Sequence, residues 1–172
     1  DKNQLHFSAA VRKNVNDYFK EKGIPQTANY AMVLQTIVML SLYIVPFILI
    51  LTIPMNIWVA LGLVIVMGLG TAGIGMSVMH DAVHGSYSRK EWVNKMFGSS
   101  MYLLGSNVFN WKVQHNILHH TNTNIDGFDG DIDSKGPIRL SHSAPYKKFH
   151  RYQHFHAFFF YGLMTLSKLV QD

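Results

Sequence analysis

The stretch AMVLQTIVMLSLYIVPFILILTIPMNIWVALGLVIVMGLGTAGIGMSVM, residues 31–79, decides the fold of this chain. It belongs to an uncharged run of 57 residues, from Gly23 to Met79, that contains no Asp, Glu, Lys or Arg. A helix needs about 20 apolar residues to cross the hydrocarbon core of a bilayer, so the run is long enough for two helices. We therefore predict a transmembrane hairpin with spans at residues 31–53 and 57–79 and a short turn at Pro54.

The sequence around the hairpin predicts an all-α integral membrane helical bundle. Residues 1–30 form a polar segment that fits either a helix lying on the membrane surface or a solvated helix. Residues 92–111 are aromatic but interrupted by Gly, Ser, Asn and Lys, so we expect an interfacial or re-entrant segment. The chain turns apolar again at its end, and we expect a third span to start at about residue 157. Residues 31–172 would then form one membrane domain.

Glycines in the second span predict close packing between the two helices of the hairpin. The residues concerned are Gly62, Gly68, Gly70, Gly73 and Gly75.

The distribution of basic residues predicts the orientation of the hairpin. Residues 1–22 contain five Lys or Arg, the turn contains none, and residues 80–156 contain nine. By the positive-inside rule, both flanks lie in the cytosol and the chain is a multi-pass protein. The same bias accounts for the net charge of +5, so we expect no nucleic-acid partner. The absence of cysteine excludes disulfides and thiolate metal sites.

Two histidine clusters follow the apolar sequence: HDAVH at residues 80–84 and HNILHH at residues 115–120. In each cluster two histidines are four residues apart, which places them on one face of an α-helix where they can bind one ion. His120 is offset by about 100° on such a helix and suits a second ion. Imidazoles without cysteine favour iron, zinc, copper or nickel over magnesium or calcium. The sequence thus predicts a metal centre at the cytosolic membrane boundary.

The segments HDAVHG and WKVQHNILHHTNTNIDGFDGDID resemble the membrane fatty acid desaturases, whose histidine boxes hold a non-haem di-iron centre. The three-residue gap between His80 and His84 is more similar to acyl-lipid, front-end and linoleoyl-CoA desaturases than to stearoyl-CoA desaturases, whose gap is longer. The resemblance implies that the catalytic iron ligands are His80, His84, His115, His119 and His120.

The third histidine box of that family, H/Q-x-x-H-H, is not found in this sequence. Two iron ions with up to about six positions each need more than five histidines. We therefore expect the sequence to be a fragment of a longer protein, with further ligands outside it, and to be inactive on its own.

The resemblance implies oxygen-dependent desaturation of fatty acyl chains carried on CoA or on a lipid. It also implies two non-haem iron ions, dioxygen as co-substrate, and cytochrome b5 or ferredoxin as electron donor. Two alternatives stay open at this point. One is a related membrane di-iron hydroxylase acting on alkanes, sterols or carotenoids, and the other is a non-catalytic membrane protein that binds zinc.

Four residues near the boxes have two interpretations each. Asp81 either orients a box histidine through its carboxylate or simply ends a helix. Trp111 and Asn116 either line the substrate site or belong to the membrane interface. His154 lies in HRYQHFH, residues 150–156, which either approaches the metal site or lies among lipid headgroups.

A run of aspartates after the second box does not match a calcium-binding EF-hand. Ser134 replaces the required glycine, and Leu140 stands where the bidentate glutamate is needed. We expect either a polar loop over the metal site or a solvated loop, containing Asp126, Asp129, Asp131 and Asp133.

Overall fold

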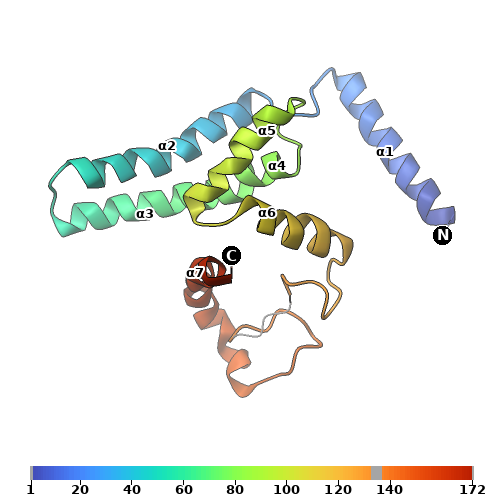
Figure 1. Cartoon of the computed structure of the whole chain (residues 1–172). Helices are drawn as coiled ribbons and strands as arrows, with labels where there is room; N and C mark the ends of the chain where they lie inside the picture. The colour runs from blue at the N-terminus through green and yellow to red at the C-terminus, as the bar shows by residue number, and fades with distance from the viewer. Residues whose placement is uncertain (1, 133–136, 172) are drawn as a thin grey trace.

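The computed structural model describes residues 2–132 and 137–171, and these residues form helices, turns and loops without a β-strand (Figure 1). This agrees with the predicted all-α class. Helix α1 (Lys2–Lys22) is exposed and extends away from the rest of the chain. Asp133 of the predicted aspartate loop lies outside the described residues.

Helices α2 (Tyr30–Thr52) and α3 (Ile57–Gly73) form the predicted antiparallel hairpin. Each helix begins at an asparagine whose side chain accepts hydrogen bonds from the first turn. Asn29 accepts from the Met32 N–H, and Asn56 accepts from the N–H groups of Trp58 and Val59, all at 3.0 Å. Such caps satisfy backbone donors that have no partner within the helix.

The second helix of the hairpin is longer than α3 alone. It continues through a π-helical segment, η1 (Ile74–Met79), into the short helix α4 (His80–Val83). Among the described residues, two stretches are long and apolar enough to cross a membrane, Tyr30–Thr52 and Ile57–Val83. Large apolar side chains on their outer faces are exposed, such as Leu51 at 68% and Trp58 at 77%. This is the surface that a bilayer covers.

Only two of the five glycines provide close contact between α2 and α3. A Cβ atom on Gly70 would lie 2.7 Å from the backbone nitrogen of Tyr43, and one on Gly73 would meet the side chain of Met39. At Gly62 and Gly68, the added Cβ would meet no described atom within 4 Å beyond its chain neighbours and the nearby backbone of its own helix. The helices therefore approach most closely at the end of α3 that leads to His80.

The apolar core lies at this same end of the hairpin. Its buried members are Ile74, Met79, Val83 and Met101. Side chains from α2 and from the segments after α4 pack against them, namely Met39, Leu40, Tyr43, Leu104, Val108 and Trp111. The first histidine cluster thus belongs to a backbone segment that is fixed by apolar packing.

Residues 92–111, predicted to be an interfacial or re-entrant segment, lie in a series of short helices that crosses this end of the hairpin. It consists of α5 (Glu91–Gly98), the 3₁₀ segment η2 (Ser99–Leu104), α6 (Val108–Trp111) and the π-helical segment η3 (Lys112–His119). Gly105, at a φ of 76°, separates η2 from α6. α5 packs against α4, and η2 packs against η1, so the second histidine cluster is carried back to the first.

The described chain ends with the 3₁₀ segment η4 (Lys148–Tyr152) and helix α7 (Gln153–Gln171). Helix α7 contains the predicted start of a third span. It is not one of the two stretches, within the part of the chain that the structure describes, that are long and apolar enough to cross a membrane. The third span and the division at residue 31 stay predictions.

The close approach at Gly70 predicts a position-specific effect on stability. Gly70→Ala should destabilise the hairpin by about 1–3 kcal/mol, because the new methyl group overlaps backbone atoms of α2. The matched variant Gly62→Ala should be neutral or stabilising by up to about 1 kcal/mol, because its methyl group enters open space in the same helix. Thermal unfolding in detergent, followed by circular dichroism, measures both. Equal stability of the two variants would contradict the packing described.

Candidate metal centre

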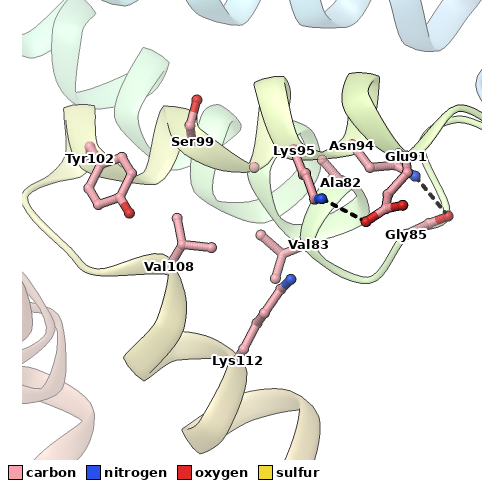
Figure 2. A pocket seen from close by; sticks show the side chains of 11 residues that line it. Ala82, Val83, Gly85, Glu91, Asn94, Lys95, Ser99, Tyr102, Val108 and Lys112 are labelled. Carbon is pink, nitrogen blue, oxygen red and sulfur yellow. Dashed lines mark hydrogen bonds and ion pairs between the residues drawn. The ribbon is translucent and has the colours of Figure 1, made fainter.

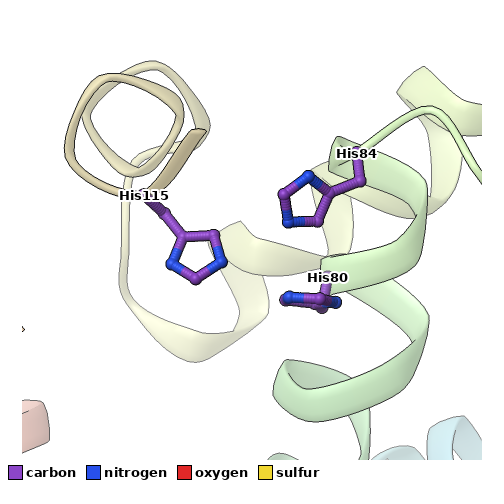
Figure 3. A group of neighbouring side chains, drawn as sticks. All are labelled: His80, His84 and His115. Atoms are coloured by element: carbon purple, nitrogen blue, oxygen red, sulfur yellow. The ribbon is translucent and has the colours of Figure 1, made fainter. Parts of the chain in front are cut away.

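The first histidine pair lies on one turn of helix directly after the π-helical segment η1. The His84 N–H donates to the His80 carbonyl at 3.1 Å, and the two ring centroids are 4.5 Å apart. Both side chains are half-buried and lie on the same side of the helix (Figure 3). The four-residue spacing therefore places both imidazoles on one face of the helix, as predicted.

The second cluster has a backbone that differs from the predicted α-helix, because η3 is π-helical. A π-helical turn contains one residue more than an α-helical turn, and such turns are frequent at functional sites. His115 consequently has both following histidines as neighbours, with ring centroids at 5.1 Å for His119 and 4.9 Å for His120. The 100° offset expected for His120 on an α-helix does not apply to this backbone.

The two clusters meet. The ring centroid of His115 is 5.3 Å from that of His80 and 5.3 Å from that of His84 (Figure 3). The ring centroid of His120 is 4.9 Å from that of His84. Among the described residues, two groups of three side chains could each hold a metal ion. Within each group, the ligand atoms all lie within 4.8 Å of one another. The first group is His80, His84 and His115, and the second is His115, His119 and Asp131. His115 belongs to both.

The chemistry of these side chains fits a bound metal ion. The Nε2 atoms of His84 and His115 are buried and have no hydrogen-bond partner among the described residues. Burial lowers the pKa of both imidazoles, and it lowers the pKa of His115 to about 4, with neighbouring histidine charges contributing. A neutral imidazole keeps the lone pair that a metal needs, and an unpartnered buried nitrogen is otherwise costly.

Two residues singled out in the sequence lie beside the histidines. Asp81 Oδ1 is 3.1 Å from His80 Nδ1. The Trp111 ring stacks on His115, with centroids 4.3 Å apart and an interplanar angle of 27°, and its edge contacts with His80 and His84 are at 5.8 Å. The functional roles of these residues stay predictions.

The other two residues with predicted roles differ in their placement. Asn116 lies near the first cluster, where its Nδ2 approaches the Val83 carbonyl at 3.5 Å and its Oδ1 is buried without a partner in the described chain. The described ring contact of His154 is with Phe155, at 4.0 Å, on helix α7. No contact among the described residues joins His154 to the five box histidines.

The aspartate loop contributes residues that the sequence did not assign to the site. Asp129 Oδ1 lies 2.9 Å from His119 Nδ1, and Asp131 Oδ2 lies 3.3 Å from the same nitrogen. The hydrogen bond from His119 lowers the pKa of Asp129 to about 2, with help from two backbone N–H groups, and Asp129 raises the pKa of His119. The only sequence signal was the proximity of the DGD tripeptide to the second box. It was compatible with a plain solvated loop.

A separate cavity of about 240 Å³ lies beside α4 and α5 (Figure 2). Its wall includes Val83, Tyr102 and Lys112, together with the ion pair between Lys95 and Glu91 at 2.8 Å. None of the five box histidines lines it. The cavity is therefore distinct from the candidate metal centre.

The fold and the site define a class of protein. Two helices suited to crossing a membrane lead to a compact group of imidazoles, two of which have a pKa lowered by burial, and the donor set of that group suits a transition metal. Such a donor set beside two apolar helices suits a membrane-associated metalloprotein.

Comparison with known proteins gives the family. The model of the fatty acid desaturase family matches residues 55–171, which include both histidine clusters. The chain belongs to the fatty acid desaturase family. Iron-dependent catalysis is a property of this family, and the chain is membrane-associated.

Named relatives support the assignment over nearly the whole chain. An sn-1 linoleoyl-lipid 6-desaturase of Arthrospira platensis is 35% identical over 168 residues, covering 98% of this chain and 46% of the relative. An acyl-lipid (8-3)-desaturase of Physcomitrium patens is 32% identical, with 96% and 35% covered. An sn-1 linoleoyl-lipid 6-desaturase of Synechocystis is 31% identical, with 96% and 46% covered. The chain thus spans about half the length of these relatives or less, and no solved structure matches it.

The shared position of His115 predicts its importance for metal binding. His115→Ala should lower the iron content of the purified full-length polypeptide more than any other single box substitution, because His115 belongs to both ligand groups. His6→Ala, in the exposed helix α1, serves as the matched control. Elemental analysis after incubation with Fe²⁺ measures the effect. Equal iron content in the two variants would contradict the geometry.

Proposed function

We propose that this chain forms part of the catalytic centre of a desaturase that introduces a double bond into fatty acyl chains. The observation that supports this most directly is the convergence of five imidazoles from two segments distant in the sequence. In a member of the desaturase family, such a cluster is best explained as part of a metal centre that activates oxygen.

The five box histidines are the proposed ligands of two non-haem iron ions, together with ligands outside this sequence. When bound, iron supplies the redox chemistry with dioxygen that an unactivated C–H bond requires. The chain's own contribution is to keep two of these imidazoles neutral and to fix the positions of the cluster by packing. His84 and His115 are kept neutral by burial.

The proposed reaction balances with dioxygen and two electrons. Two adjacent CH₂ groups each lose one hydrogen, and the C–C bond between them becomes a double bond. One dioxygen molecule is reduced to two waters by two electrons and two protons taken from the substrate as two hydrogen atoms, together with two electrons and two protons from outside. Cytochrome b5 or ferredoxin is the proposed donor of the external electrons.

The acyl chain that reacts is proposed to be attached to a lipid rather than to CoA. This choice is supported by the names of the relatives, which include linoleoyl-lipid and acyl-lipid desaturases. The relatives differ in the position that they desaturate, so the position of the double bond is left unassigned.

The proposed topology is multi-pass, with the histidine clusters on the cytosolic face. The excess of Lys and Arg on both sides of the hairpin supports this orientation. Residues 31–172 form a partial desaturase domain, with residues 1–30 as a cytosolic segment that precedes it.

Residues beside the cluster are proposed to position the ligands or to line the acyl site. Asp81 orients His80 through the contact between its carboxylate and Nδ1. Trp111 covers the open face of His115 and excludes water there. Asn116, whose Oδ1 lacks a partner among the described atoms, faces the same region. His154 is proposed to lie near the site, on helix α7, where its described ring contact is with Phe155.

The test of this function is the product formed in a host that expresses the full-length protein. Membrane fatty acids should contain a new double bond, and His119→Ala should abolish it while His6→Ala leaves it unchanged. Gas chromatography with mass spectrometry of lipid-linked and CoA-linked acyl chains measures the product and its carrier. A hydroxylated product would favour the related di-iron hydroxylases instead. Retained desaturation in the His119 variant would contradict the ligand assignment.

A further inference from the structure

Asp129 is an unusual residue within a polar loop because it is completely buried, with 0% of its side chain exposed. Its Oδ1 faces His119 Nδ1 at 2.9 Å and also accepts a hydrogen bond from the Asp131 N–H at 3.0 Å. Its Oδ2 accepts from the Asn124 N–H at 2.8 Å. A buried carboxylate persists only when its oxygens are satisfied in this way.

The loop folds around this carboxylate. Asn124 adopts a φ of 62° and Gly127 a φ of 80°, two left-handed turns that bring the chain back on itself. Backbone bonds from Phe128 and Asp129 to the Ile125 carbonyl close the turn, at 3.1 and 3.0 Å. The backbone N–H groups of residues 124 and 131 therefore point at the carboxylate from both sides, and its position relative to His119 is fixed.

The contact determines which nitrogen of His119 is available for a metal. A carboxylate is only a hydrogen-bond acceptor, so Nδ1 must carry the proton in this pair. The lone pair of the neutral ring is then on Nε2. In carboxylate–histidine–metal arrangements, one ring nitrogen likewise donates its proton to the carboxylate and the other nitrogen binds the metal. Loss of the carboxylate usually lowers metal affinity.

We propose that Asp129 is a positioning residue that holds His119 with its proton on Nδ1 and its Nε2 directed to the metal centre. The proposal rests on the proposed function, because it takes His119 to be an iron ligand.

The neighbouring aspartates differ from Asp129 in ways that separate their roles. Asp131 is also near His119 Nδ1, but its side chain is 53% exposed and its distance is longer, at 3.3 Å. Asp126 lies in the same loop and accepts hydrogen bonds from Ser141 and Ser143 instead of a histidine. Asp126→Asn is therefore a matched control for disturbance of the loop.

The test uses Co²⁺ as the probe, bound to the full-length protein in lipid nanodiscs and followed by its visible absorption. Asp129→Asn and Asp129→Ala should each weaken Co²⁺ binding by about 10- to 100-fold. Asp126→Asn should bind as the wild-type protein does. Wild-type affinity in both Asp129 variants would overturn the proposal.

A double-mutant cycle separates positioning from a merely structural role of Asp129. If Asp129 acts through His119, Asp129→Ala should weaken Co²⁺ binding no further in a His119→Ala background. An equal additional loss in that background would show that Asp129 supports the loop alone, and would overturn the proposal.

The outcomes also distinguish this proposal from the function on which it rests. Normal desaturation by the wild-type protein with unaltered metal affinity in the Asp129 variants would refute the positioning role only. If Asp129 and His119 show the predicted coupling in Co²⁺ binding but the wild-type protein yields no desaturated product, the function is refuted and the positioning role stands. A wild-type protein that binds no Co²⁺ would overturn both.

Discussion

The contact between the α4 turn and the π-helical segment η3 is the interaction on which the candidate metal centre depends. Neutral imidazoles attract one another only weakly, so their convergence must be imposed by the backbone that carries them. Apolar burial does this: Ile74, Met79 and Val83 fix the helix of the first cluster, and Trp111 packs against the same core. The close contacts of Gly70 and Gly73 in α3 with α2 hold the two helices together beside that core. The hairpin therefore offers an apolar surface suited to a membrane and also positions the histidine clusters.

Four of the five histidines occupy two kinds of environment. His84 and His115 are neutral because burial disfavours the charged imidazole, and their Nε2 atoms lack partners in the described structure. His80 and His119 each have a carboxylate at Nδ1, from Asp81 and Asp129. Burial keeps the lone pairs of His84 and His115 available to a metal. The carboxylates at Nδ1 of His80 and His119 determine which ring nitrogen presents its lone pair. Both are needed where several imidazoles must bind ions together.

The hairpin and the histidine clusters could be predicted from the sequence because their signals are local. An uncharged run gives the length of two spans, and a four-residue spacing gives a shared helical face. The π-helical backbone of Lys112–His119 could not be predicted, because the sequence pattern at the second box is also compatible with an α-helix. Asp129 was missed for a different reason. Its burial depends on backbone donors that surround it only after the loop has folded.

The central claim is that the clustered histidines bind iron, and the metal content and coordination of the purified full-length protein test it most directly. Elemental analysis with iron K-edge X-ray absorption should find iron with a first shell dominated by imidazole nitrogen. Zinc in the absence of iron would contradict the account, and so would an iron site without histidine ligands.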